Sequence, residues 1–371
     1  MTKMPTERLD TSGLAEKAHE AIKQGSKEDL LQLLNAGLDA NAGVEETTLL
    51  IEAIAVAKSE EMVELLLEHG ADINKGSAWL VTPLCAAAAT NNLAMTKLLI
   101  DKGSDLGKLS DDRPVYTITT PLHFAIHNRN AVMAKLLLDH GHNPNVASNQ
   151  RHYPIIEAIK QDCPDIIRLL LNTACCRTTN ITGSLGGLEY PPLYQALFIY
   201  RKYYIAEIIL DSKRCMLIFM GDSYLSLMIR RAFDNSFLIM KTAKLLLEAG
   251  CDMECYDRYQ YPPFVTLVKA NKTIFEMRIM KPLMLLFVYA GVYPNQYAIE
   301  LLREFAIQPE DKNFVDWLES KITNPRKLQE LCRCHLRRLF GIFPKHRIAK
   351  LPLPEPLLDY VSLADLRSFY G

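Results

Sequence analysis

The residues with the most obvious potential for chemistry lie near the C-terminus. Cys332, Cys334 and His335 form a C-x-C-H sequence, which suggests a zinc site. A structural zinc site needs four ligands, and no second pair of cysteines or histidines follows at the required spacing. We therefore expect Cys332 to be a small buried thiol and the chain to hold no metal.

Three further groups share features with phosphate-binding or catalytic sites. Gly183, Gly186 and Gly187 make a glycine-rich loop, but no Lys-Ser or Lys-Thr follows it, so phosphate binding is not expected. His69 and His140 each precede a glycine, where a histidine usually makes local hydrogen bonds. No Gly-x-Ser-x-Gly, His-Glu-x-x-His or kinase motif occurs. Because no nucleophile, base and orienting residue can be placed together, we expect a binding protein without catalytic residues or cofactors.

The element that must position the C-terminal cysteines is a helix of about four turns. Leu328, Cys332 and Leu336 recur at four-residue steps, and Leu331 lies at a three-residue offset, so one face of this helix is apolar. The opposite face is basic. Between residues 324 and 350 there are eight Lys or Arg and one Glu, but no basic run exceeds two residues. This pattern favours a solvated helix face, and nucleic acid is not an expected partner.

After the helix, leucine and proline alternate in the segment Leu351-Pro352-Leu353-Pro354. Each proline fixes its own φ and disfavours helix at the residue before it, so this segment is predicted to be extended. Pro356 can then open a second short helix. A fragment of this size cannot bury two apolar faces by itself. The residues leave two interpretations open: the fragment caps the body of the protein, or it binds a partner.

Composition places the chain among globular proteins. Its 371 residues are 49% hydrophobic and 23% charged, with a net charge of −1 and nine cysteines without regular spacing. The N-terminal residues lack the apolar core of a signal peptide. The longest apolar run, Leu283 to Ala290, is far shorter than the roughly 18 residues that span a bilayer. We expect no membrane anchor and a cytoplasmic location, with the nucleus as an alternative.

Internal repeats determine the predicted fold. Leucine-rich runs end in Gly37, Gly70, Gly103 and Gly141, at steps of 33, 33 and 38 residues. Thr120-Pro121-Leu122-His123-Phe124-Ala125 precedes one run, and the whole pattern resembles the ankyrin repeat. Proline suits the first turn of the inner helix, and glycine suits the left-handed end of the outer helix. The expected fold is all-α: an ankyrin-repeat solenoid of about eight repeats over residues 1–295.

Residues 296–322 contain two more amphipathic pieces, which we expect to form a helical cap or linker over the last repeat. Insertions in a solenoid map to surface loops, which often carry binding residues. The longer step after Gly103 places Arg113 and Tyr116 in such a loop, and Tyr200 and Arg201 lie where an inner helix turns into its outer helix. These four residues are the predicted substrate contacts.

The C-terminal pattern Leu328-x-x-x-Cys332-x-x-x-Leu336, followed by Leu351-Pro-Leu-Pro, resembles a SOCS box, here residues 323–371. Lys327 departs from that family, which usually has a small residue or proline before the leucine. The resemblance implies that the first helix binds elongin C, together with elongin B, and that the extended segment binds cullin-5. The implied elongin C contacts are Leu328, Leu331, Cys332 and Leu336, and the implied cullin contacts are Leu351, Pro352, Leu353 and Pro354.

Taken together, the two halves resemble the ankyrin repeat and SOCS box family. The resemblance implies an adaptor in intracellular signalling: the repeats hold a substrate, and the tail recruits elongin B, elongin C and cullin-5 with its RING partner. The substrate would then be ubiquitinated and degraded by the proteasome. Two alternatives remain at this point. One is an ankyrin scaffold whose C-terminal helices only cap the repeats, and the other is an enzyme with an unrecognised site in the inserted loops. The substrate itself is not encoded in any motif.

Overall fold

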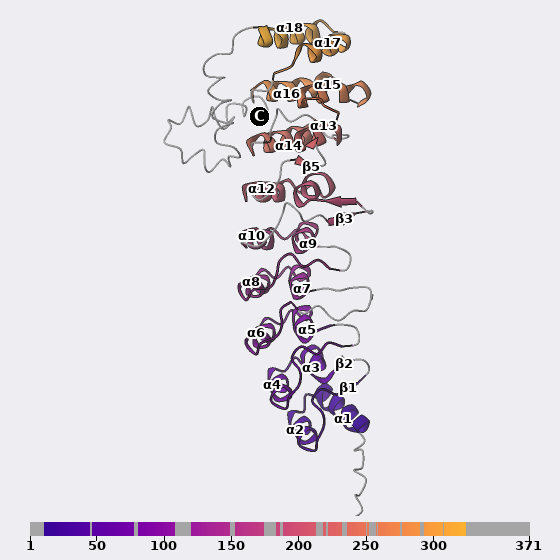
Figure 1. Ribbon diagram of the computed structural model, residues 1–371, viewed down its shortest axis with the longest axis vertical. Coiled ribbons are helices and arrows are strands. Elements are labelled where there is room, and N and C mark those ends of the chain that lie inside the picture. Colours follow the sequence, from indigo (N-terminus) through magenta and orange to yellow (C-terminus); the bar gives the residue numbers. More distant parts are fainter. Residues whose placement is uncertain are drawn as a thin grey trace, which may run out of the picture. The chain divides into compact units, whose positions relative to one another are not determined.

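The chain divides into two compact units, residues 1–192 and 193–371. The computed structural model describes residues 11–44, 47–77, 81–107, 120–148, 153–173, 183–185, 188–212, 218–219, 222–231, 236–249, 251, 257, 259–274, 277–289, 293–306 and 308–323. Each unit contains a stack of helix pairs, in which we call the first helix of a pair inner and the second outer (Figure 1). The predicted all-α ankyrin fold is confirmed, with short two-stranded hairpins between some pairs.

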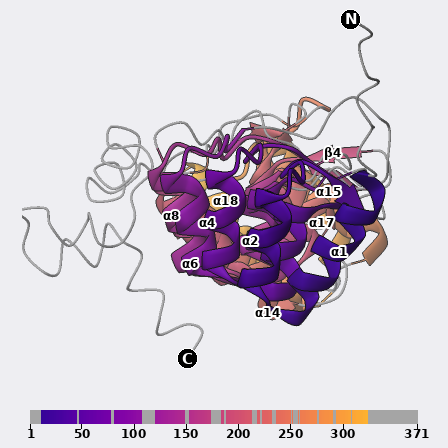
Figure 2. The ribbon, with the colours of Figure 1, turned by 90° about the horizontal axis from the view of Figure 1, so that it is seen from below.

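The first unit contains five helix pairs within its described residues. The inner helices are α1 (Thr11–Gln24), α3 (Leu49–Glu52) continued by the π-helical turn η1 (Ala53–Ala57), α5 (Pro83–Ala89), α7 (Pro121–His127) and α9 (Pro154–Gln161). The outer helices are α2 (Lys27–Asn35), α4 (Glu60–Glu68), α6 (Leu93–Asp101), α8 (Ala131–Asp139) and α10 (Pro164–Asn172). The hairpins are β1 (Gly43–Val44) with β2 (Thr47–Thr48), and β3 (Gly183–Leu185) with β4 (Leu188–Tyr190). Figure 2 looks along this stack and shows the outer helices on one side and α1 on the other.

Local hydrogen bonds explain where these helices begin. Thr82 and Thr120 precede α5 and α7, and their hydroxyl oxygens accept from the backbone N–H groups of Cys85 (3.2 Å) and His123 (3.4 Å). Proline takes the next position, as in α7, where its missing N–H would have no helical partner. The predicted place of Pro121 in the first turn of an inner helix is therefore confirmed.

Glycine ends four of the outer helices, as predicted. Gly37, Gly70, Gly103 and Gly141 have φ values of 96°, 87°, 90° and 92°. In the first of these turns, the N–H of Gly37 donates to the carbonyl of Leu34, which lies in the last turn of α2. A side chain would strain this left-handed backbone, so the glycine spacing marks the repeat.

The turn between the inner and outer helices is also left-handed, but it seldom uses glycine. Only the first described pair has one, Gly25, with a φ of 72°. The next four pairs place Lys58, Asn91, Arg129 and Asp162 there, with φ values between 51° and 65°. A non-glycine residue in this conformation costs about 1 kcal/mol, so packing of the helix pairs must hold these turns in place.

The turn η1 accommodates one extra residue. Nine residues separate Thr82 from Asn91 and Thr120 from Arg129, but ten separate Thr48 from Lys58, which flank α3 and η1. A π-helical turn absorbs a single insertion and keeps the flanking residues in phase. The second repeat therefore keeps both its buried face and its left-handed turn.

The second unit repeats the pairing of helices. The short helix α11 (Pro192–Tyr194) continues into the π-helical turn η2 (Gln195–Ile199), and α12 (Tyr203–Asp211) is its outer helix. The hairpin β5 (Ile218–Phe219) with β6 (Asp222–Ser223) precedes two further pairs, α13 (Tyr224–Arg231) with α14 (Ser236–Glu248) and α15 (Pro263–Ile274) with α16 (Met277–Tyr289). The predicted amphipathic pieces of residues 296–322 are helices α17 (Gln296–Phe305) and α18 (Pro309–Thr323). Helix α17 packs against α15 and α18.

The cores of the two units differ in composition. Among the described residues, the buried hydrophobic side chains of the first unit are aliphatic, methionine or cysteine, with no aromatic ring among them. The second unit buries Tyr194, Tyr224, Phe264 and Phe287 almost completely. The rings of Phe264 and Phe287 meet edge to face with centroids 6.2 Å apart, a favourable arrangement for aromatic pairs.

Candidate protein-binding surfaces

The loops of the first unit are tied together by a ladder of asparagine hydrogen bonds. The side chain of Asn41 donates to the carbonyl of Gly70 (2.9 Å) and accepts from the N–H of Asp72 (2.7 Å). One repeat later, Asn74 accepts from the N–H of Asp105 (2.8 Å). The recurrence of D-x-N at residues 39–41 and 72–74 is a sequence signal for this ladder, which the search for leucine and glycine repeats does not detect. These bonds fix the loops of successive repeats against one another.

The ladder stops where the third loop has Gly107 in place of asparagine. The longer insertion follows, and two of the predicted substrate contacts, Arg113 and Tyr116, lie outside the described residues. Their role as substrate contacts stays a prediction.

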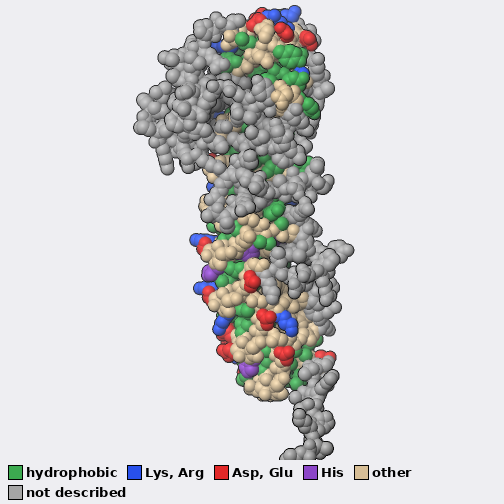
Figure 3. All heavy atoms as spheres, in the orientation of Figure 1, with side chains coloured by type: hydrophobic (Ala, Val, Ile, Leu, Met, Phe, Trp, Pro, Cys, Tyr) green, Lys and Arg blue, Asp and Glu red, His purple; other side chains and the backbone are tan. Residues whose placement is uncertain are grey.

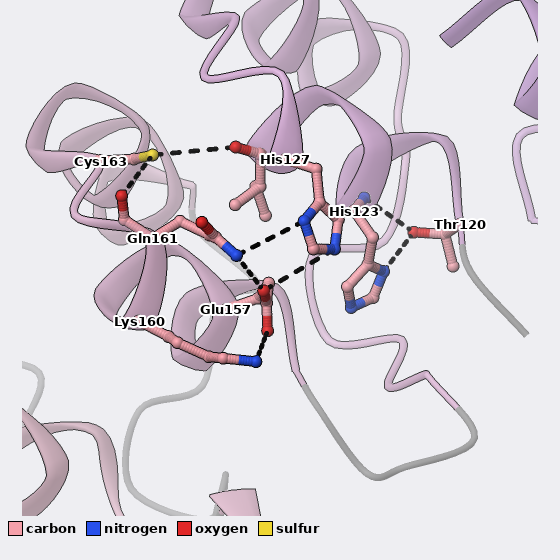
Figure 4. Close-up of polar contacts among 8 residues, drawn as sticks. Thr120, His123, His127, Glu157, Lys160, Gln161 and Cys163 are labelled. Atoms are coloured by element: carbon pink, nitrogen blue, oxygen red, sulfur yellow. Dashed lines mark hydrogen bonds and ion pairs between the residues drawn. The ribbon is translucent and has the colours of Figure 1, made fainter. Parts of the chain in front are cut away.

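Polar side chains also connect the inner helices α7 and α9 (Figure 4). Glu157 is 2% exposed, and one of its carboxylate oxygens accepts a hydrogen bond from Gln161 (2.9 Å) and lies 3.7 Å from Nε2 of His127. The other oxygen lies 3.7 Å from Nζ of Lys160. A second pair of the same kind joins His19 to the buried Glu52. In both cases a histidine of one inner helix contacts a buried carboxylate of the next.

These polar groups connect successive repeats of the stack. The carboxylate of Glu157 already has His127, Lys160 and Gln161 as partners. Elsewhere in the unit, burial raises the pKa of the Cys85 thiol to about 11, so this cysteine stays protonated. Within the described ranges, no group of three or more His, Cys, Asp or Glu residues is arranged to bind a metal ion. His69 and His140 each bond to a backbone carbonyl four residues earlier (2.9 Å), which confirms the local role predicted for them.

The other two predicted substrate contacts are described, and they lie in the turn between η2 and α12. Tyr200 is half-buried, and Nζ of Lys202 lies 5.7 Å from the centre of its ring. Arg201 is exposed and takes the left-handed position of the turn, with a φ of 53°. The structure thus places both residues where the sequence predicted, at the turn from an inner helix to its outer helix. Whether they bind a substrate remains a prediction.

Aromatic and basic side chains continue from this turn onto the outer helices of the second unit. Tyr204 is 44% exposed, and Nζ of Lys241 lies 5.9 Å from the ring of Tyr203. Burial raises the pKa of Tyr203, so its phenol stays neutral. Tyrosine is enriched at the centres of protein interfaces, whereas lysine is more common at their solvated rim. The surface of the second unit is therefore suited to binding a protein.

The predicted elongin C and cullin contacts all belong to residues 324–371, which lie outside the described part of the chain. The described residues therefore belong to the expected ankyrin array and its cap, and not to the expected SOCS box.

Two family models match the chain. Ankyrin repeats match residues 18–110 and 84–180, and a SOCS box matches residues 324–362. The chain combines ankyrin repeats with a SOCS box. The predicted resemblance to the ankyrin repeat and SOCS box family is confirmed in both parts. Both are adaptor domains without catalytic function of their own.

A segment of this ankyrin repeat and SOCS box chain is also similar to a human protein, Ankyrin repeat and SOCS box protein 18. The two are 42% identical over 76 residues, which is 19% of this chain and 16% of the relative. The match therefore covers about a sixth of that relative's length. In the part of the chain that the structure describes, no helix is long and apolar enough to cross a membrane.

Proposed function

We propose that this chain is the substrate-recognition subunit of a ubiquitin ligase built on elongin B, elongin C and cullin-5 with its RING partner. Ankyrin repeats and a SOCS box on one chain support a substrate-adaptor role in a cullin-type ligase. The SOCS-box match at residues 324–362 is the observation that carries the proposal. The chain would do no covalent chemistry and would act by raising the effective concentration of substrate lysines near the charged ubiquitin-conjugating enzyme.

The position of α17 and α18 favours this proposal over a plain ankyrin scaffold. A solenoid needs a cap on its terminal apolar face. Helix α17 already packs on α15, and α18 packs on α17, so residues 296–323 can provide that cap. The cap therefore does not require residues 324–371, and we propose that these bind other proteins. We accordingly propose three functional segments: the array at 1–295, the cap at 296–322 and the SOCS box at 323–371.

The proposed division of labour within the tail follows from its sequence. Leu328, Leu331, Cys332 and Leu336 would bind elongin C, and Leu351 to Pro354 would bind cullin-5. The substrate would bind the ankyrin surface and be degraded by the proteasome after ubiquitination. Such a complex would operate in the cytoplasm, with the nucleus as a second location.

Co-purification of elongin B and C tests the proposal. Leu328 and Cys332 lie on one predicted helical face, and truncating such anchors commonly costs about 2 kcal/mol or more, or over tenfold in affinity each. We expect the double change Leu328→Pro, Cys332→Phe to abolish elongin C binding by the full-length chain. Arg333→Ala, on the opposite basic face, is the matched control and should bind normally. Undiminished elongin C binding by a folded double variant would refute the proposed role of the helix.

A further inference from the structure

A buried carboxylate shapes the loop in front of α15. Asp257 is 2% exposed, and its Oδ1 accepts hydrogen bonds from the backbone N–H groups of Tyr259 and Tyr261, both at 2.8 Å. Its Oδ2 accepts from the hydroxyl of Thr266 in α15 (3.1 Å). A charge is costly to bury unless its oxygens are hydrogen-bonded, and here three donors meet that need. The buried carboxylate therefore fixes the conformation of the loop of residues 259–261 and ties it to α15.

The backbone of the same loop is equally constrained. The N–H of Asp257 donates to the carbonyl of Tyr261, and the N–H of Gln260 donates to the carbonyl of Asp257, each at 2.8 Å. Gln260 takes a left-handed conformation with a φ of 63°. This tight turn holds Tyr259 in an exposed position, with 60% of its surface open to solvent. A large apolar side chain is thus presented to solvent on a rigid support.

Lys269 of α15 lies beside this loop and joins it to α17. Its Nζ is 3.6 Å from the ring centre of Tyr261 and 5.3 Å from that of Tyr297, which is 44% exposed in the first turn of α17. A hydrogen bond that the Lys269 ammonium group donates to the phenol oxygen of Tyr261 is the main cause that raises the pKa of Lys269, so the amine stays charged. We call Tyr259, Tyr261, Lys269 and Tyr297 the tyrosine–lysine surface. Figure 3 shows hydrophobic side chains, tyrosine included, exposed around the α15 and α17 end of this unit.

Lys269 forms no ion pair among the described residues, although the carboxylate of Asp257 is buried under the same loop. Other lysines of the chain pair with carboxylates, for example Lys27 with Glu61 (2.8 Å) and Lys281 with Asp311 (2.6 Å). Among the described residues, no carboxylate lies within ion-pair distance of Lys269. Its neighbours are phenol rings, which attract a cation but leave its net charge unchanged. The surface is therefore complementary to a negatively charged group next to apolar atoms.

We propose that the tyrosine–lysine surface binds an acidic segment of the substrate protein. Tyrosine offers a large contact area at a small cost in conformational entropy, and the Asp257 loop reduces that cost further. Lys269 supplies the charge that selects Asp or Glu in the partner. A nucleic acid fits less well, because a polyanion is held by a row of cations and this surface has one. The inference rests on the proposed function only in calling the partner a substrate.

Selection from a random dodecapeptide library displayed on phage tests the inference on the purified full-length chain. We expect the selected peptides to be enriched in Asp and Glu relative to the unselected library. Their affinity should fall at least about tenfold on Lys269→Glu and on Tyr259→Ala, because these changes remove the charge and the most exposed ring. Lys135→Glu and Val132→Ala, two exposed residues of α8 in the first unit, are the matched controls, and each should change affinity by less than about twofold.

The selection can also contradict the inference. A library that yields no binders, or binders without an excess of Asp and Glu, would overturn it. So would binders that keep their affinity for Lys269→Glu, or a labelled oligonucleotide that binds the chain and is lost in that variant. Lys269→Gln replaces Lys269→Glu if circular dichroism shows the latter to be unfolded. Because elongin co-purification depends on residues 328–336, its failure would leave the peptide result unchanged, and the two tests are distinguishable.

Discussion

The two units are built from the same kind of helix pair, but their inner helices pack through side chains of different size. In the first unit the fifth residue after the start of the inner helix is a fully buried alanine, namely Ala53, Ala87, Ala125 and Ala158. In the second unit the equivalent residue is Ala196, then Met228 and Leu267, each of the latter two 3% exposed. Larger side chains at this contact require their neighbours to be repacked. The same unit also buries the aromatic residues Tyr194, Tyr224, Phe264 and Phe287.

The surfaces of the two units also differ, in the kind of side-chain contact that they carry. The first unit joins its repeats through asparagine ladders and histidine–carboxylate pairs. Every lysine-to-ring contact between described residues lies in the second unit, as at Lys202, Lys241 and Lys269. The comparison suggests that the first unit mainly provides a regular support, whereas the second has diverged toward binding. The ankyrin family model, which reaches residue 180, matches the regular part.

The strongest test of the regular part removes one member of its buried pairs. Glu52 is 5% exposed, and its carboxylate forms a hydrogen bond with Nδ1 of His19. We expect His19→Leu to lower the free energy of unfolding by about 3 kcal/mol, because it leaves a buried carboxylate unpaired. The double change His19→Leu, Glu52→Leu should recover most of that loss. Urea denaturation measures both, and a single variant within about 1 kcal/mol of the wild type would show that the pair contributes little.

A buried histidine makes the first unit sensitive to acid. His142 is 3% exposed, and its ring nitrogens form no hydrogen bond within the described residues. Burial, aided by repulsion from His123, lowers the pKa of His142 from 6.5 to about 4. The unfolded chain therefore binds this proton more readily than the folded chain at any pH between these two values. Stability should rise with pH through this window and be lost as the pH falls.

The corresponding variant is His142→Leu, since the first described repeat has a buried Leu38 at the same place. Between pH 7 and pH 5 we expect the wild type to lose about 2 kcal/mol more of its unfolding free energy than the variant. The variant should also be more stable at pH 7 by about 1 kcal/mol, because an unsatisfied polar ring is removed. Parallel pH profiles for the two proteins would show that His142 is not the sensitive group.

Glycine substitutions in the inter-helix turns compare the two units directly. Arg129 of the first unit and Arg201 of the second have nearly the same φ, 52° and 53°. Arg129→Gly and Arg201→Gly should each raise the free energy of unfolding by roughly 0.5 kcal/mol, because relief of strain slightly exceeds the added entropy of the unfolded chain. Only Arg201→Gly should weaken substrate capture. Equal capture by both variants would remove Arg201 from the substrate-binding surface.

Sequence reasoning predicted the features that depend on short-range chemistry. The glycines and prolines of the first unit were placed correctly, since each has few alternatives at its backbone conformation. The inter-helix turns were harder, because Lys58 and Arg129 carry no local signal for a left-handed backbone. The same holds for Glu52, whose partner His19 is 33 residues away and becomes its neighbour only through the stacking of repeats.

The candidate binding site was predicted only in part. Tyr200 and Arg201 were chosen for their residue types, and their place at the turn from an inner to an outer helix was predicted correctly. The tyrosine–lysine surface was missed because it combines a loop, α15 and the cap helix α17, and Asp257 looks like an ordinary polar loop residue in the sequence. Neither its burial nor its three donors can be read from sequence spacing.

The most direct test of the adaptor account changes Leu351-Pro352-Leu353-Pro354 to four alanines in the full-length chain and measures substrate ubiquitination in a reconstituted reaction. A rigid proline segment loses little entropy on binding, and alanines remove both that advantage and the leucine contacts. The account predicts that the variant retains elongin B and C, fails to bind cullin-5, and no longer supports ubiquitination. Cullin-5 binding and ubiquitination at wild-type levels would contradict it.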